Sequence, residues 1–443
     1  MLASVIIPVW NGVDVIGDCL TALYAQAGSD LQEVICVDNA SPDGAGQLIA
    51  DRFPQVRLIS QPINLGFAGG VNAGLGAARG DVFILLNQDC LVQAGWLDAL
   101  SAGLSAHPEF GIAGCTLFNA DGSLNHAGAQ LRKPIALGQH FTDRGDDQPR
   151  AVDYVTGAAM AIRRSTWDTV GLFDDGFYPA YYEEVDYCYR ARQHGLAVGY
   201  VPAATVRHLF SSREWQRDPI KSWATHQHSR YRFVCKHFDT GQLTQFFELE
   251  SAEIEAEPSY EMNAARVLGS RDTLRDLHEI AARRAADLAD PLTVDQVRLL
   301  RVGFAQIARQ AFAAIERQAR ANDYVSPRWL DASPLPTDAA ERPALIDQLR
   351  SIDQREQAIL AQAFFAADPS ALKRVGKRLV SLATGREHRL LTELNVLHTQ
   401  RLAVLEQLLR AQHDHTAYAL NQVRQQFDRR LALLETLTDY DYR

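Results

Sequence analysis

The sequence predicts an α/β domain built on a mainly parallel sheet, followed by an all-α C-terminal region. Five consecutive apolar residues, 82–86, lie between Gly80-Asp81 and three polar residues, a pattern typical of a central strand covered on both faces. Strand-like and helix-like segments alternate closely before it, which favours right-handed crossovers between parallel strands. Beyond residue 240 the pattern is helical, with abundant Ala, Leu and Arg.

The elements of the α/β region can be placed in order. Residues 15–25 have helical spacing, because Ile16, Leu20 and Leu23 fall on one face. Short apolar runs bounded by Gly, Pro, Asn or Asp indicate strands, at residues 4–9, 33–37, 56–59, 82–86, 111–118 and within 154–164. Further helices are expected at residues 46–53, after the glycine-rich stretch to about residue 78, and from about residue 183.

The chain has 443 residues, 47% hydrophobic and 22% charged, which is the composition of a globular protein with room for two or three domains. We expect one domain at residues 1–240 and an α-helical one at 241–443. A further subdivision is expected near residues 323–343, where four prolines occur: Pro327, Pro334, Pro336 and Pro343.

The formal net charge of −10 disfavours a nucleic-acid partner. We expect no signal peptide, because a predicted strand begins almost directly after Met1, and no apolar run approaches the ~18 residues of a membrane span. The six cysteines lack metal-type spacing and are typical of buried apolar side chains in a reducing compartment. The sequence therefore predicts a cytoplasmic protein and leaves open a peripheral contact with the inner face of the cytoplasmic membrane.

Oxygen-bearing side chains follow two of the predicted strands. Asp38 ends the second strand, and Asn87 and Asp89 follow the strand at 82–86. The carboxyl ends of parallel strands share one edge, where α/β sheets bind ligands, so a site is expected there. Between them, the glycine-rich stretch 64–74 lets backbone approach a ligand, but it has neither the dinucleotide fingerprint nor a P-loop.

Four segments in this order resemble the family 2 glycosyltransferases, and in particular the bacterial rhamnosyltransferase-like branch: residues 4–11, 37–41, 64–74 and 85–89. The resemblance covers about residues 3–237. It implies a GT-A fold, which is Rossmann-like with a mainly parallel sheet. It also implies transfer of a sugar from a nucleotide diphosphate sugar to an acceptor hydroxyl, usually with inversion.

The resemblance assigns the donor-binding residues position by position. Asp38 would bind a pyrimidine base, and Asp89 would reach Mg²⁺ or Mn²⁺ on the diphosphate, while His208 either completes the metal shell or has a structural role. The whole set expected to bind the donor is Pro8, Val9, Asn11, Asp38, Asn64, Gly66, Asn87, Gln88 and Asp89.

The acceptor side is assigned in the same way. Thr156 and Gly157 would lie beside the donor sugar and the acceptor, although close strand packing explains them equally well. Residues 183–186 match the family's acidic pattern, so the resemblance makes Glu184 the general base and leaves Glu183 as a second candidate. Acids in a first helical turn also stabilise a helix by themselves. Asp186 is expected to anchor the helix or Arg190.

Basic residues follow the acidic pattern and could close over the diphosphate or form a solvated helix face: Arg213, Lys221, Arg230, Arg232 and Lys236. Residues 248–261 are expected to form a linker or exposed helix. The basic amphipathic patch at 373–378 could contact anionic lipid, and residues 388–437 carry an interrupted heptad pattern. The C-terminal helices would serve self-association, giving a homo-oligomer, or acceptor docking. Packing within one chain is the alternative.

The branch implies dTDP-rhamnose as donor and a bacterial surface glycan or glycolipid as acceptor. Two alternatives remain at this stage. One is a galactofuranosyl- or other hexosyltransferase that uses a UDP-sugar. The other is a scaffold or assembly protein with a weakly active transferase domain.

Overall fold

The computed structural model describes residues 1–209 except 27 and 29, then 219–256 and 259–322, and the single residues 351, 354, 355, 396 and 400. The described residues fall into two compact units. One combines residues 1–250 with 275–300, and the other contains residues 251–274 and the described residues from 301 onward. These units do not test the domain boundary expected at residue 240, which stays a prediction.

The N-terminal part of the sheet is parallel and follows the predicted strand–helix alternation. Its elements are β1 (Ala3–Val9), α1 (Ile16–Gln26), β2 (Leu31–Asp38), α2 (Ala45–Arg52), β3 (Arg57–Ser60), α3 (Gly66–Ala77) and β4 (Val82–Leu86). The strand order here is β4-β1-β2-β3, and every pair is parallel. The register pairs Val9 with Asp38, so β1 and β2 end at the same edge.

The second part of the sheet is mixed. It adds β5 (Cys90–Val92), α4 (Trp96–Ala106), β6 (Phe110–Asn119), β7 (Leu124–His126), β10 (Arg150–Val152), β11 (Ala159–Arg163) and β12 (Ala197–His208). β11 inserts antiparallel between β4 and β6, whereas β12 runs parallel to β6. The full order is β10-β12-β6-β11-β4-β1-β2-β3, and β5 pairs with β12. The α/β fold predicted from the sequence is confirmed.

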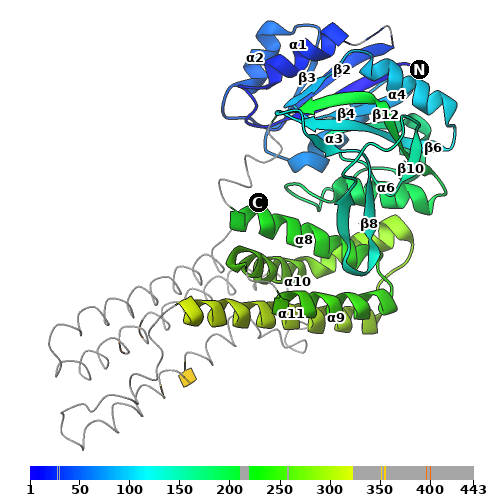
Figure 1. Cartoon of the computed structure of the whole chain (residues 1–443). Coiled ribbons are helices and arrows are strands. Elements are labelled where there is room, and N and C mark those ends of the chain that lie inside the picture. Colours follow the sequence, from blue (N-terminus) through cyan, green and yellow to red (C-terminus); the bar gives the residue numbers. More distant parts are fainter. Residues whose placement is uncertain are drawn as a thin grey trace, which may run out of the picture. The chain divides into compact units, whose positions relative to one another are not determined.

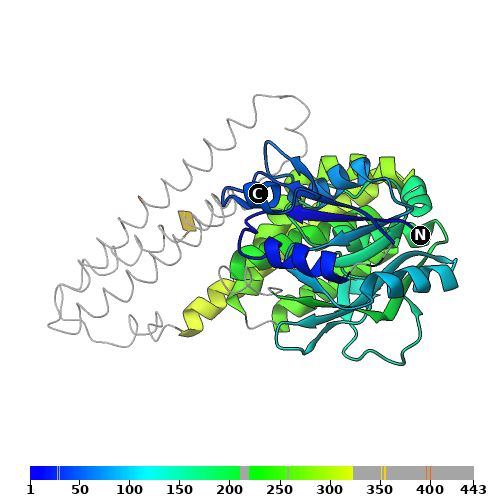
Figure 2. The same ribbon diagram turned by 90° about the horizontal axis from the view of Figure 1, so that it is seen from above.

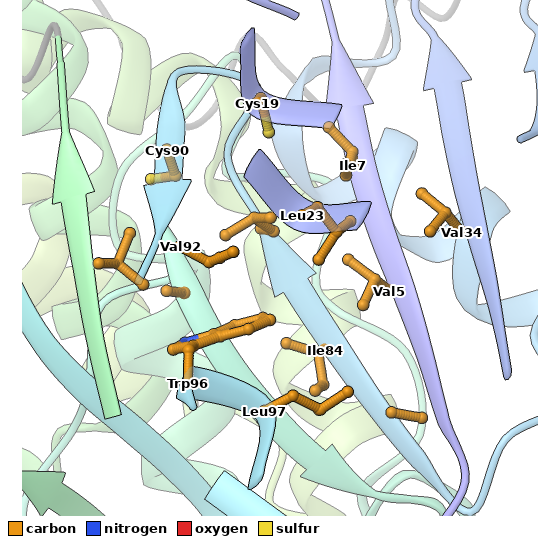
Figure 3. Packing of buried hydrophobic residues seen from close by; sticks show 14 of the residues in the cluster. Val5, Ile7, Cys19, Leu23, Val34, Ile84, Cys90, Val92, Trp96 and Leu97 are labelled. Carbon is orange, nitrogen blue, oxygen red and sulfur yellow. The ribbon is translucent and has the colours of Figure 1, made fainter. Parts of the chain in front are cut away.

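Helices cover both faces of the sheet. Figures 1 and 2 show α1, α2 and α4 on one face and α3 on the other. Val5 and Ile7 of β1 join the core beneath the first face together with Leu23 of α1 and Leu97 of α4 (Figure 3). Ile6 points the opposite way, and its side chain leaves no room for a Cβ at Gly74 of α3. Each fully buried Leu, Ile or Val in these layers contributes about 1.5–3 kcal/mol.

Smaller elements complete the first unit. The hairpin of β8 (Ala129–Arg132) and β9 (Leu137–His140) contains the short 3-10 helix η1 (Lys133–Ile135). After β11 come α5 (Arg164–Val170) and α6 (Glu183–Gln193), which begins where the sequence predicted a helix. All six cysteines are free and buried, as expected.

Only helices are described after residue 218: α8 (Pro219–His237), α9 (Thr240–Ala256), α10 (Tyr260–Leu288) and α11 (Val294–Asn322). Within the described part of the chain, none of the helices is both long and apolar enough to cross a membrane. The expected linker or exposed helix at 248–261 is largely helical, but Glu250 is buried. The proline cluster, the patch at 373–378 and the heptad pattern lie outside the described residues.

Candidate active site

The β1 exit loop and the triplet 87–89 are joined by a side chain. Gln88 follows β4 and forms two hydrogen bonds with the backbone of Trp10: its Nε2 donates to the carbonyl at 2.9 Å, and its Oε1 accepts from the amide at 3.1 Å. A Cβ on Gly12 would lie 2.1 Å from Gln88 Oε1, so this contact requires glycine there. Gln88 therefore positions the loop that contains Asn11.

The end of β2 forms the second side of the predicted donor pocket. Asp38 is half-buried, and one carboxylate oxygen accepts a hydrogen bond from the Ser41 amide at 3.0 Å. The neighbouring Asn39 is buried, and its Nδ2 donates to the carbonyl of Gly66 at 3.0 Å. Asn39 thereby ties the Asp38 loop to the start of α3. This role of Asn39 is not predicted by the sequence motifs.

The glycine-rich stretch forms the start of α3. Asn64 Oδ1 accepts from the Gly66 amide at 2.8 Å. Gly66 has a φ of +69°, and a Cβ there would lie 2.9 Å from the Pro179 carbonyl, so the position favours glycine. The next amide, that of Phe67, donates to the same carbonyl at 2.9 Å. The predicted donor stretch thus contacts the loop that precedes the acidic helix α6.

Asp89 and His208 come together through strand pairing. β5 and β12 are antiparallel, with His208 opposite Cys90, and the Leu209 amide donates to the Asp89 carbonyl at 3.0 Å. Asp89 Oδ1 then lies 3.1 Å from His208 Nε2. Both side chains are partly exposed to solvent, Asp89 by 16% and His208 by 13%.

This pair fits a divalent cation. A carboxylate oxygen and an imidazole nitrogen are suitable ligands for Mn²⁺ and acceptable for Mg²⁺. The thiol of Cys90 is also near, since the three possible ligand atoms lie within 4.8 Å of one another. Cys90, however, belongs to the hydrophobic core (Figure 3), and burial together with the Asp89 charge raises its thiol pKa well above the usual value. Asp89 and His208 are therefore the better ligands.

The first turn of α6 carries the two glutamates. Burial raises the pKa of Glu184 to about 7. Glu183 is 5% exposed, and burial followed by the Glu184 charge raises its pKa well above the usual range. The raised pKa of Glu183 favours its neutral acid form, while a pKa of about 7 lets Glu184 exchange a proton near neutral pH.

Residues 156–158 connect the two halves of the site. The Ala158 carbonyl accepts a hydrogen bond from the Asn87 amide at 2.9 Å. The adjacent Gly157 is buried, and a Cβ on it would lie 3.6 Å from the Cβ of Glu184. The amide of Thr156 donates to the buried His126, at 3.3 Å. The triplet 87–89 and the candidate base therefore flank the same short segment.

Three of the basic residues after α6 form ion pairs within the protein. Arg230 pairs with Glu250, Arg232 pairs with Asp174 and Glu279, and Lys236 pairs with the buried Asp174 and Asp186 and with the partly exposed Asp287. The prediction that these three cations close over the diphosphate is wrong, because each is already neutralised inside the protein. Arg213 lies outside the described residues. Asp186 does bind Arg190, at 2.8 Å, as expected.

Comparison with known proteins identifies the family of the chain. The model of glycosyl transferase family 2 matches residues 4–170. N-acetylglucosaminyl-diphospho-decaprenol L-rhamnosyltransferase of Mycobacterium tuberculosis is 31% identical over 229 residues, which cover 46% of this chain and 74% of that relative. The pre-mycofactocin glycosyltransferase of the same organism is 28% identical over 243 residues, covering 53% of this chain and 48% of that relative.

Among solved structures, the crystal structure of GalNAc-T7 with UDP, GalNAc and Mn²⁺ has 18% identity and a TM-score of 0.48, over 56% of this chain and 51% of that one. The match to the mycobacterial rhamnosyltransferase, with the family model, shows that the chain belongs to glycosyl transferase family 2 and to its rhamnosyltransferase-like branch. It is a glycosyltransferase that uses a nucleotide sugar.

Proposed function

We propose that the protein is an inverting, metal-dependent rhamnosyltransferase that takes rhamnose from dTDP-rhamnose. The proposed acceptor is a hydroxyl of a lipid-linked glycan intermediate. The mycobacterial relative is named as a rhamnosyltransferase acting on N-acetylglucosaminyl-diphospho-decaprenol, and this supports an acceptor of the same chemical class. The predicted cytoplasmic location, membrane contact and self-association remain predictions.

The observation that carries the proposal is the position of Gly157-Ala158 between the two reactive parts of the site. The Asn87 amide donates a hydrogen bond to the Ala158 carbonyl, and the Cβ of Glu184 lies beside Gly157. In this proposal the sugar lies along this segment, with its diphosphate toward Asp89 and His208 and its anomeric carbon toward Glu184. An inverting displacement needs this separation of the leaving group from the base.

The transfer follows from these positions. The carboxylate of Glu184 accepts the proton of the acceptor hydroxyl, and the acceptor oxygen forms a bond to the anomeric carbon. The bond from that carbon to the diphosphate oxygen breaks on the opposite face, and the nucleotide diphosphate leaves with the electron pair. A Mg²⁺ or Mn²⁺ ion held by Asp89 and His208 would neutralise charge on this leaving group. Asp38 would bind the pyrimidine base.

A thermal-shift panel with dTDP, UDP and their sugars, with and without Mn²⁺, tests the donor site. A ligand that binds only the folded state raises the apparent stability, by about 2.7 kcal/mol at a hundred times its Kd. We expect dTDP and dTDP-rhamnose to stabilise the protein when Mn²⁺ is present, and Asp89→Ala to abolish the shift. Preference for UDP-sugars would move the assignment to a UDP-hexosyltransferase. No response to any nucleotide would contradict the proposal and favour the scaffold.

A further inference from the structure

Helix α8 lies outside residues 4–170, which the family model matches. It nevertheless contacts residues before and after Glu184 in the chain. Ser229 Oγ donates a hydrogen bond to the carbonyl of Ala180 at 3.1 Å, just before α6. Lys236 Nζ lies 2.9 Å from Asp186 Oδ1, two residues after Glu184. One helix thus holds the main chain that carries Glu184 at two points.

Lys236 is the centre of a buried ion cluster. Its ammonium group lies 3.0 Å from Asp174 Oδ2, 2.9 Å from Asp186 Oδ1 and 2.7 Å from Asp287 Oδ2, and Lys236, Asp174 and Asp186 have 0% exposed side chains. Buried carboxylates are stable only when cations and hydrogen bonds compensate the lost hydration. Lys236 therefore ties the start of α6 to the segment before it and to α10.

The charge state of Asp186 agrees with this anchoring. Burial alone would oppose ionisation, but Lys236 and Arg190, with a hydrogen bond to His237, hold the pKa of Asp186 well below its usual value. His237, also on α8, lies 2.7 Å from Asp186 through Nε2. Asp186 is thus ionised, and Lys236 and His237 of α8 fix the orientation of its carboxylate.

A second connection reaches the residue before the glutamates. Arg230 Nε donates to the Ile135 carbonyl at 2.9 Å, and the Tyr182 hydroxyl donates to the neighbouring Ala136 carbonyl at 2.6 Å. Tyr181 and Tyr182 have φ of 77° and 69°, in the left-handed region that residues other than glycine rarely adopt. Such backbone strain persists only where the surroundings over-determine the conformation.

We propose that α8 is the positioning element of the transfer reaction, with Lys236 and Ser229 as positioning residues for Glu184. They fix the main chain at 180–186 and so the direction in which Glu184 presents its carboxylate. Positions 184 and 186 lie on opposite sides of an α-helix, so Asp186 can be anchored in the interior while Glu184 faces Gly157. This inference rests on the proposed function for the role of Glu184.

The mild variant Ser229→Ala is the first test, because it removes a single hydrogen bond. We expect amide hydrogen exchange in residues 178–187 to become about tenfold faster, and exchange in β1 to stay unchanged. In the transfer reaction we expect kcat to fall about tenfold, while the donor KM stays within about twofold of its value in the natural protein. The reason is that a misoriented base slows the chemical step more than it weakens donor binding. Ser105→Ala, which removes a hydroxyl from an exposed helix position, is the matched control.

Lys236→Met is the stronger variant, and we expect a larger loss of kcat, about a hundredfold. Should it fail to fold, Ser229→Ala still decides the question. Unchanged exchange at 178–187 in Ser229→Ala, or a loss of nucleotide binding as large as the loss of kcat, would overturn the inference. The exchange measurement needs no donor, so an absence of transfer by the natural protein would contradict the proposed function separately.

Discussion

Asp89 Oδ1 lies 3.1 Å from His208 Nε2, although the two residues are 119 positions apart in the chain. The pairing of β5 with β12 creates this contact, since it places His208 opposite Cys90, directly after Asp89. Asp89 comes from a local motif, and sheet topology brings His208 to it.

The first prediction concerns that pair. We expect the Mn²⁺ affinity, measured by calorimetry in the presence of dTDP, to fall in both Asp89→Ala and His208→Ala. The loss should be about 10–100-fold or more, because losing even a residue that only supports a metal ligand lowers metal affinity by that range. Gln93→Ala serves as the control, because its side chain bonds only the neighbouring Leu91 carbonyl. Full Mn²⁺ affinity in His208→Ala would mean that His208 has a structural role.

The second prediction concerns pH. Because burial raises the pKa of Glu184 to about 7, the carboxyl is largely protonated below pH 7 and cannot accept the acceptor proton. We expect kcat/KM to rise with pH through this region, about tenfold per unit on the acid side, and to level off above it. Nucleotide binding measured over the same range is the control. A kcat/KM that stays flat from pH 5 to 8 would count against Glu184 as the base.

The third prediction concerns stability. The pKa of Glu183 in the folded protein lies well above its ordinary value of 4.5, so the folded state keeps a proton that the unfolded chain releases. Stability is therefore lost as pH rises from about 4.5 toward the folded-state pKa. Glu183→Gln removes this loss, so its melting temperature should exceed that of the natural protein increasingly from pH 5 to 8. Glu248→Gln, at an exposed position, should show no such trend.

The fourth prediction concerns Gly12. A Cβ there collides with Gln88, so Gly12→Ala should displace that side chain and break both of its hydrogen bonds to Trp10. We expect about 1–3 kcal/mol lower stability and weaker nucleotide binding. Gly76→Ala is the matched control: nothing lies within 4 Å of its Cβ, and alanine should stabilise α3 by about 0.5–1 kcal/mol. Equal nucleotide affinity in both variants would contradict a role for this contact.

The sequence predicted much of the first unit because its signals are local. The apolar run at 82–86 forms β4. Asp38 is the last residue of β2, and Asp89 follows β4 in the same sheet. The antiparallel insertion of β11 was not predicted, since strand direction is set by partners far away in the chain. The cations Arg230 and Lys236 were misassigned because their acidic partners are distant in the chain: Glu250 lies 20 residues after Arg230, and Asp174 lies 62 residues before Lys236.

The central claim is that Glu184 is the base of a sugar transfer from a nucleotide sugar. The most direct test is the single-turnover transfer rate of Glu184→Gln beside Glu183→Gln, with dTDP-rhamnose and Mn²⁺. We predict that Glu184→Gln loses about 10²–10⁴-fold in rate while still binding dTDP. Glu183→Gln should keep most of the activity, because the raised pKa of Glu183 favours its neutral acid form, which Gln resembles. Near-normal transfer by Glu184→Gln, or loss of transfer only in Glu183→Gln, would contradict the account.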